Sequence, residues 1–188
     1  MRNRIAITGD VAEVELRSQK WGTQICLIDA EDASVADQIP GSWFASYSPE
    51  TRSFYCQTQI KNKKLYGTKG LGLHRLIMGL PNAEIDHINH DTLDNRKANL
   101  RLADRCENMQ NKLRPLSTSH TGVLGVYWEP DRRKYRAELT VFGKKMRVGR
   151  FDSLHDASVA ILHARKDLLP FSQEALQIGK EMATNADA

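Results

Sequence analysis

Four polar residues between positions 86 and 108 have the types and the spacing that phosphodiester hydrolysis requires. Asp86 and His87 are adjacent, Asn99 lies twelve positions after the histidine, and Asn108 lies nine positions later again. Cleavage of a phosphodiester needs a base that deprotonates water and a hard cation that neutralises the charge developing on the phosphate. One imidazole with carboxylate and amide oxygens can supply the base and the ligands for the cation. We therefore interpret this stretch as a candidate nuclease active site.

Short elements are predicted to position these residues. Residues 84–88 form one strand candidate, and residues 100–102 form another in which two leucines flank an arginine. Asp104 and Glu107 have the spacing of a capping box, so a helix is predicted to start at Arg105. The segment is therefore expected to fold as strand, loop, strand and helix.

In this arrangement, Asp86 and the amide oxygen of Asn108 would share one divalent ion, and His87 would act as general base. An acid and a histidine inside an apolar strand are costly to bury without a purpose, which favours chemistry for both. Asn99 would either orient the imidazole or brace the loop, because Asn side chains commonly bond nearby backbone. For the same reason, Asp94 with the asparagine that follows it is interpreted as an ordinary turn.

The segment resembles the HNH endonucleases that carry a ββα-metal finger, in the variant with Asn at the last position that occurs in phage and intron homing enzymes. The resemblance covers residues 74–112 and includes the HRLIMG and LDNRKANLR runs. It implies that Asp86 and Asn108 bind metal and that His87 and Asn99 are catalytic. Because the implied ligands are oxygens, Mg²⁺ or Mn²⁺ is expected rather than Zn²⁺.

Length and composition predict a multi-module α+β protein. The 188 residues are 40% hydrophobic, which favours several small cores over one large core. The sequence shows neither a run of about 18 apolar residues nor an apolar segment near its start, so no membrane span or signal peptide is predicted, and a cytoplasmic location is expected. The three cysteines, Cys26, Cys56 and Cys106, are widely spaced, which indicates reduced thiols rather than a zinc ribbon.

The chain divides into five predicted parts. They are a β-rich accessory region (1–67), the nuclease finger (68–113), a Pro/Ser/Thr/Gly linker (114–122), a second module (123–171) and a tail (172–188). No chemistry is assigned to the accessory region.

The net charge of +4 is unevenly distributed. Residues 111–151 carry 10 Lys or Arg against 3 acids, whereas residues 1–60 carry 5 against 8. A local basic patch of this kind is typical of a surface that binds phosphate, although a solvated charged face is the alternative.

The residue pattern of the second module predicts three strands followed by a helix. In the second strand, apolar residues (Tyr135, Ala137, Leu139, Val141) alternate with polar ones (Lys134, Arg136, Glu138, Thr140). A helix capped by Ser153 has its apolar residues three or four positions apart, so it is expected to cover the apolar face. The basic face would stay open, and a narrow antiparallel sheet can enter a DNA major groove.

This module is similar to the AP2 DNA-binding domain through its GVYW, RRKYRAEL and GRFDS runs and its Ala-bearing helix. Tyr135 stands where the family usually has Trp. The resemblance implies a three-stranded sheet packed on one helix, with double-stranded DNA as partner. The implied DNA contacts are Arg132, Arg133, Lys134, Arg136, Lys144, Lys145 and Arg147.

Together, these features predict a metal-dependent DNA endonuclease of the homing type that is located in the cytoplasm, which is the host cytoplasm if a phage encodes it. The alternative is a non-catalytic DNA-binding regulator in which the finger survives only as a fold. The four intact candidate residues favour the enzyme, since a decayed site is expected to lose at least one. No small-molecule substrate is expected. Two different modules without a heptad run suit a monomer on an asymmetric DNA site.

Overall fold

The computed structural model describes residues 3–59, 70–112, 115 and 118–172. They form two compact units, Met1–Ala103 and Asp104–Ala188, which are described separately. The predicted boundary at residues 67 and 68 lies outside the described residues, as do residues 173–188 of the predicted tail and part of the predicted linker. None of the described helices is long and apolar enough to cross a membrane.

The first unit opens with an antiparallel sheet whose strand order follows the chain. Its strands are β1 (Ile5–Thr8), β2 (Val11–Ser18) and β3 (Gly22–Asp29). Alternation along β2 buries Ala12, Val14 and Leu16 completely, while Glu13 between them is exposed. This period of two is the expected signature of a strand with one face on a core.

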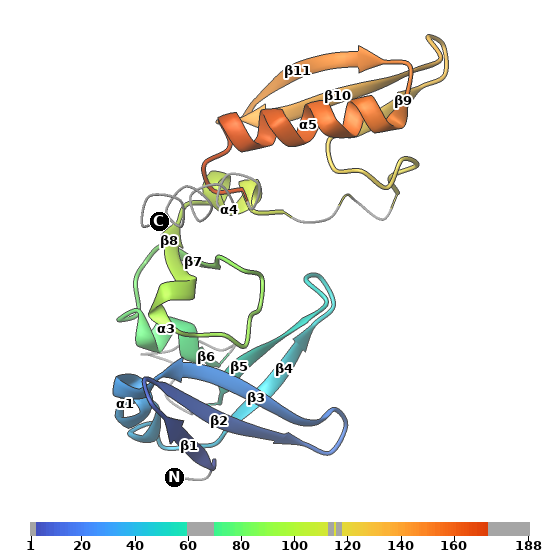
Figure 1. Ribbon diagram of the computed structural model, residues 1–188. Helices are drawn as coiled ribbons and strands as arrows, with labels where there is room; N and C mark the ends of the chain where they lie inside the picture. The colour runs from blue at the N-terminus through green and yellow to red at the C-terminus, as the bar shows by residue number, and fades with distance from the viewer. Residues whose placement is uncertain (1–2, 60–69, 113–114, 116–117, 173–188) are drawn as a thin grey trace. The chain divides into compact units, whose positions relative to one another are not determined.

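A second antiparallel sheet packs against the same core (Figure 1). It contains β4 (Trp43–Ser48), β5 (Ser53–Thr58) and β6 (Leu71–Gly72), and it is accompanied by the short helices η1 (Ala30–Asp32), α1 (Ala33–Asp37) and α3 (Leu73–Ile77). Leu71 and Leu73, from the predicted nuclease finger, are buried in one cluster with Trp43 and Cys56 from the predicted accessory region. The two segments therefore share a single hydrophobic core.

The last sheet of the first unit is the pair that carries the candidate site. β7 (Glu84–His87) and β8 (Leu100–Ala103) are antiparallel, with Asp86 opposite Arg101 and His87 opposite Leu100. The loop between the strands ends in the short helix η2 (Lys97–Asn99). These strands match the predicted ones to within one residue.

The second unit starts with α4 (Arg105–Gln110), and the predicted capping box is confirmed. Glu107 N donates to Asp104 Oδ1 over 2.8 Å, and Asp104 N donates to Glu107 Oε2 over 2.7 Å. The reciprocal bonds satisfy two of the backbone donors that a helix start leaves unpaired. The two strands β7 and β8 belong to the first unit, so the three elements of the predicted finger are divided between the units.

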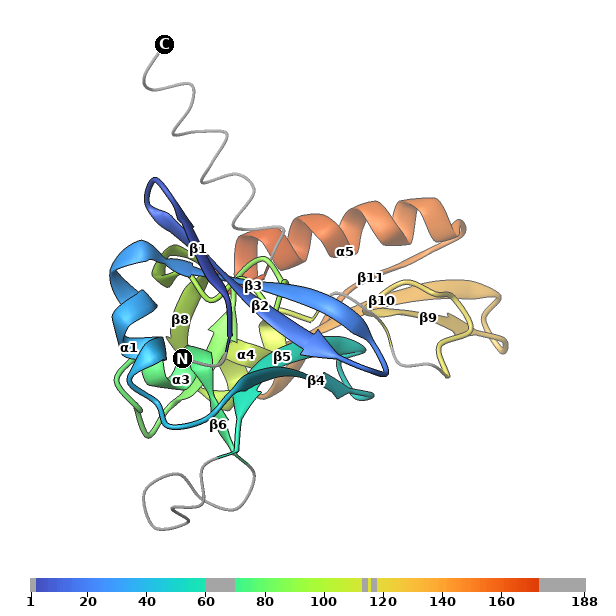
Figure 2. The same ribbon diagram turned by 90° about the horizontal axis from the view of Figure 1, so that it is seen from below.

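The predicted three strands and helix of the second module are also present. β9 (Val126–Glu129), β10 (Lys134–Val141) and β11 (Lys144–Phe151) form a sheet with β10 in the centre, and α5 (Leu154–Leu168) lies along one face (Figure 2). Ala137 and Leu139 are buried against Ala157 and Ile161 of the helix. The side chain of Ser153 caps α5 by accepting from Asp156 N over 3.0 Å.

A close backbone approach occurs beside a bulge in this sheet. The register of β10 against β11 shifts between Ala137 and Glu138, and Glu138 N donates to Gly125 O over 2.8 Å. Gly125 has a φ of +80°, and a Cβ there would lie 2.8 Å from Glu138 O and 3.0 Å from Ile161 Cγ1. Only glycine fits both the backbone conformation and the space.

We expect Gly125→Ala to lower the free energy of unfolding by about 1 to 3 kcal/mol, because it combines left-handed strain with a clash against backbone. Gly143→Ala is the matched control, since Gly143 has a φ of +77° but a Cβ added there would meet no heavy atom within 4 Å. Denaturant unfolding of the full-length variants measures both. Equal losses in the free energy of unfolding would show that the space around Gly125 does not exclude a Cβ atom.

Candidate active site

His87 is the last residue of β7, and its ring is enclosed by side chains from three segments. The side chain is buried, and its Nε2 lies 3.0 Å from Oδ1 of Asn95. The ring of His74, from α3, stands edge-on to it with 5.3 Å between centroids, and the Tyr55 ring of β5 lies 6.2 Å away. The imidazole is therefore held in one place by packing as well as by hydrogen bonding.

Burial lowers the pKa of His87 below its ordinary value. The hydrogen bond with Asn95 and the negative charges of Asp86, Asp91 and Asp94 act in the opposite direction, but the loss of solvation is the largest effect. The imidazole is consequently neutral at pH 7, which is the form that a general base requires.

His74 is a neutral neighbour of this base. Burial, followed by the charges of His87 and Arg75, lowers the pKa of His74 to about 3. Its Nδ1 is buried and finds no hydrogen-bond partner within the described part of the chain. The sequence placed His74 only at the edge of the family resemblance, and its contact with His87 depends on the packing of α3 that local sequence does not reveal.

Asp86 precedes the base in β7 and is bound by an arginine from the neighbouring strand. Arg101 Nη2 and Nε donate to Asp86 Oδ2 over 2.6 and 2.9 Å, and both side chains are largely buried. The cross-strand register places the two residues directly opposite one another. The ion pair fixes the position of the carboxylate that was predicted to bind metal.

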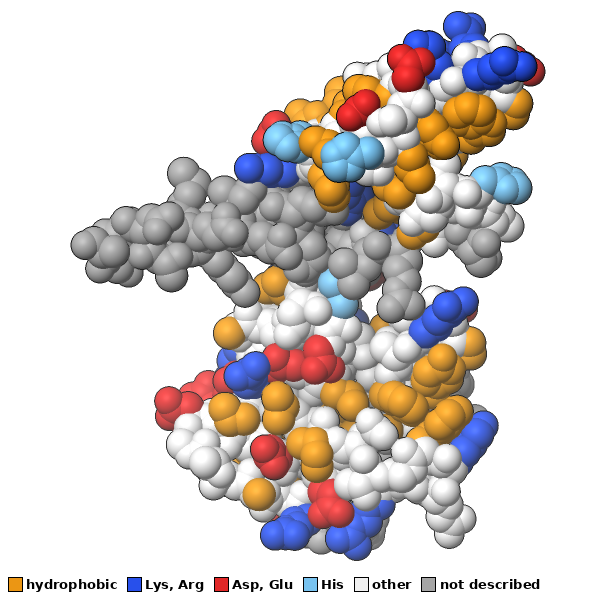
Figure 3. Space-filling view, turned by 45° about the vertical axis from the view of Figure 1, so that its right-hand side comes forward, with side chains coloured by type: hydrophobic (Ala, Val, Ile, Leu, Met, Phe, Trp, Pro, Cys, Tyr) orange, Lys and Arg blue, Asp and Glu red, His pale blue; other side chains and the backbone are white. Residues whose placement is uncertain are grey.

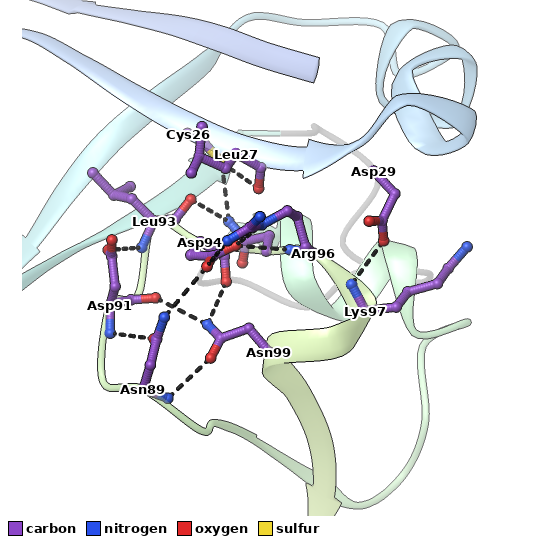
Figure 4. Close-up of polar contacts among 11 residues, drawn as sticks. Cys26, Leu27, Asp29, Asn89, Asp91, Leu93, Asp94, Arg96, Lys97 and Asn99 are labelled. Atoms are coloured by element: carbon purple, nitrogen blue, oxygen red, sulfur yellow. Dashed lines mark hydrogen bonds and ion pairs between the residues drawn. The ribbon is translucent and has the colours of Figure 1, made fainter. Parts of the chain in front are cut away.

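Asn99 braces the loop that connects β7 to β8 (Figure 4). Its Oδ1 accepts from Asn89 N over 2.9 Å, and its Nδ2 donates to Asp94 O over 2.7 Å. Its backbone carbonyl also accepts from Ile88 N over 2.9 Å. Of the two roles considered from sequence, these contacts correspond to loop bracing, whereas the amide on the His87 ring belongs to Asn95.

Asn95 is the site residue that the sequence interpretation missed. It was assigned to an ordinary turn, yet its side chain is completely buried and bonded to His87. No local signal separates it from a turn asparagine, because its other contacts come from a strand far away in the sequence.

Asn108 lies in α4 of the second unit, where Asn108 N donates to Asp104 O over 2.9 Å. The helix is supported from α5, since Arg165 Nη2 donates to the carbonyl oxygens of Gln110 and Lys112, each over 3.2 Å. Arg165 and Gln110 are both buried. The last carbonyl of α4 and one two residues beyond it thus bind a cation, as helix C-termini prefer.

The predicted metal ligands, Asp86 and Asn108, belong to different compact units. Among the described residues, no group of three or more His, Cys, Asp or Glu side chains could hold a metal ion. The predicted pair consists of one carboxylate and one amide, and its oxygen chemistry fits Mg²⁺ or Mn²⁺. The ion pair of Asp86 with Arg101 keeps a charged oxygen donor beside the base.

The predicted DNA contacts of the second unit divide into exposed and ion-paired groups. Arg132 and Arg133 are exposed in the turn before β10, and Lys144, Lys145 and Arg147 are exposed on β11. Lys134 Nζ instead pairs with Asp152 Oδ1 over 2.9 Å. Lys and Arg side chains gather toward one end of this unit (Figure 3).

The open face of the sheet also carries acidic residues that moderate its charge. Glu129 binds Arg136 over 3.1 Å and Arg150 over 2.6 Å, and the Arg136 guanidinium lies 5.3 Å from the centroid of the Tyr127 ring. Glu138 approaches Lys145 at 3.7 Å. Arg150 was not predicted, because its place opposite Arg136 follows from the strand register.

Residues 72–110 match a family model described as HNH endonuclease. The match spans 39 of the 188 residues, from Gly72 in β6 to Gln110 in α4, and it contains the four predicted site residues as well as Asn95. No curated protein and no solved structure matches the chain. The matched segment supports an HNH nuclease.

We expect phosphodiester cleavage to rise with pH and to reach half its maximum below about 6.5, the ordinary His value. The base acts only when it is neutral, and the lowered pKa of His87 keeps it neutral to lower pH. Initial cleavage rates between about pH 4.5 and 8.5, a range that spans the titration of His, measure the midpoint.

His87→Ala should reduce the rate roughly 10²-fold or more while DNA affinity stays the same. A midpoint above neutral pH, or near-normal cleavage by this variant, would remove His87 from the role of base.

Proposed function

We propose that the protein is a metal-dependent DNA endonuclease of the homing type that uses His87 as general base. The observation that carries this proposal is the buried, neutral imidazole inside the segment that matches HNH endonucleases. A buried histidine surrounded by carboxylates is unfavourable for folding alone, and it is useful where a proton must be accepted near neutral pH.

In the proposed reaction, His87 accepts a proton from water as the water oxygen bonds to phosphorus and the bond to the leaving oxygen breaks. Asn95 holds the ring from its Nε2 side, and Arg101 fixes the Asp86 carboxylate. Asp86 and Asn108 would hold one Mg²⁺ or Mn²⁺ ion, which supplies positive charge to the phosphate when it is bound.

The second unit supports a role in binding double-stranded DNA. Its sheet leaves one face uncovered by α5, and that face and the adjoining turn carry exposed arginines and lysines. Glu129 fixes Arg136 against Tyr127, so this guanidinium is preorganised rather than freely mobile. We propose that this AP2-like sheet positions the nuclease as a monomer on an asymmetric site.

A non-cutting DNA-binding regulator is the second candidate. It is favoured by one contact, the ion pair of Asp86 with Arg101, because a guanidinium bound to the carboxylate competes with a cation there. The two candidates share the basic sheet and differ in cleavage, so DNA binding does not separate them.

Incubation with phage or host DNA, with and without Mg²⁺ or Mn²⁺ and followed by mapping of the ends, tests the proposal. Cleavage should require the metal and disappear in EDTA. Asp86→Ala should abolish it, whereas Asn108→Asp should retain part of it, because an oxygen ligand remains. Glu84→Gln removes another acid from β7 and is the control that should still cut.

Full activity in chelator would exclude metal dependence. Intact DNA binding without cutting in either metal would instead establish the regulator.

The exposed basic residues should set the salt dependence of DNA binding. Replacing Arg132, Arg133 and Arg147 together with Gln should weaken binding, and each lost phosphate contact should reduce the slope of log K against log salt by about 0.9. Lys166→Gln, on the exposed side of α5, is the charge control. Titrations of mapped and random duplexes across a salt series measure the effect, and an unchanged slope in the triple variant would show that DNA binds elsewhere.

A further inference from the structure

The loop that holds His87 is fastened to a strand of the N-terminal sheet. Leu27 N in β3 donates to Leu93 O, and Asn95 N donates to Leu27 O, both over 2.8 Å. Leu27 and Asp94 form a parallel bridge as a result. The sheet that the sequence assigned to an accessory region therefore bonds directly to the backbone beside the candidate base.

A side-chain relay continues from this strand to the imidazole. Asn95 Nδ2 donates to Cys26 Sγ over 3.0 Å and to Leu93 O over 3.5 Å, while Asn95 Oδ1 lies 3.0 Å from His87 Nε2. Cys26 and Asn95 are both completely buried. Two side chains, Cys26 and Asn95, thus connect the N-terminal core with the base.

The chemistry of the relay selects one tautomer of His87. A backbone carbonyl only accepts hydrogen bonds, so the amide must turn its NH₂ group toward Leu93 O and Cys26. Its oxygen then faces the ring and can only accept, which requires the proton on Nε2. In the neutral ring, the lone pair that takes up a proton is consequently on Nδ1.

A buried asparagine that serves only the loop would be expected to bond backbone at both ends of its amide. Asn99, in the same loop, does so through Asn89 N and Asp94 O. Asn95 differs, because its amide joins two side chains, Cys26 and His87, that lie 61 positions apart in the sequence. Its geometry is that of an orienting group for the ring.

We propose that Asn95 and Cys26 are positioning residues for the general base. Cys26 orients the Asn95 amide, the amide oxygen accepts the Nε2 proton of His87, and Nδ1 carries the lone pair that takes the proton from water. This inference rests on the proposed function, in which His87 is the base. It makes β3 a part of the active site.

Nitrogen-15 NMR of the full-length protein, labelled at histidine and free of metal and DNA, tests the tautomer directly. Neutral His87 should carry its proton on Nε2, and this proton should exchange slowly with water because it is buried and hydrogen-bonded. Asn95→Leu removes the acceptor at similar volume and should speed the exchange. Asn95→Asp retains an oxygen and keeps the test decisive if the leucine variant does not fold, since the exchange should then stay slow. A proton on Nδ1 in the wild type, unchanged exchange in Asn95→Leu, or fast exchange in Asn95→Asp would overturn the inference.

The role of Cys26 is tested with another buried residue of the same core as control. Cys26→Ala removes the acceptor of the Asn95 amide and should lower cleavage by roughly 10- to 100-fold at unchanged DNA affinity. Cys26→Ser supplies a hydroxyl acceptor and should recover most of the rate. Leu16→Ala removes part of a completely buried side chain from the same core and should lose stability without a comparable loss of rate. Equal losses of rate in both alanine variants would show that Cys26 acts only through packing.

The NMR result separates this inference from the proposed function. It reports on His87 in a protein that holds neither metal nor DNA, so it stands whether or not the chain cuts. If the protein cuts DNA but His87 carries its proton on Nδ1, the proposed nuclease function is retained and the roles of Asn95 and Cys26 are contradicted. If His87 carries its proton on Nε2 but the protein never cuts DNA, the hydrogen-bonded arrangement is retained and the nuclease function is contradicted.

Discussion

Removal of the His87 imidazole from water is the constraint on which the candidate site depends. The surrounding carboxylates favour the protonated ring, and burial outweighs them, so the ring stays neutral. Two of these carboxylates, Asp86 and Asp94, are themselves ion-paired with Arg101 and Arg96. The arginines offset part of the negative charge that would otherwise stabilise an imidazolium. The neutral state of His87 among acids thus depends on all the groups around it. The lowering of its pKa would be lost if the loop opened to solvent.

That burial cannot come from β7 and β8 alone, because a two-stranded sheet is marginal in water without further packing. The wall around His87 is built by α3, by β5 and by the loop that β3 anchors. The shared core beneath them joins Leu71 and Leu73 to strands from the start of the chain. The N-terminal sheets therefore have a structural reason to accompany the matched segment, because β5 and the anchoring strand β3 lie outside it.

Local patterns predicted the local structure well. The Asp104 capping box, the Ser153 cap and the alternation through β10 each depend on neighbours within a few residues, and each appears as expected. The contacts of Asn95 could not be predicted in this way, because its partner Cys26 lies on a distant strand. The pairing of Arg150 with Glu129 was hidden for a similar reason, since strand register and the bulge decide which charges meet. Turn chemistry and long-range pairing use the same residue types, so sequence alone assigns the commoner role.

The support of α4 by Arg165 has a consequence for how such a chain can be assembled in evolution. Arg165 of α5, in the same unit as the helix with Asn108, donates to carbonyls at and just after the end of that helix. Recombination within the predicted linker would place a different C-terminal module after α4, and the helix would lose its contact with Arg165. A junction between Ala103 and Asp104 would keep both compact units whole, but it would separate Asn108 from the gene segment that encodes His87. We expect the matched segment and the second unit to have been inherited together, because α4 belongs to both.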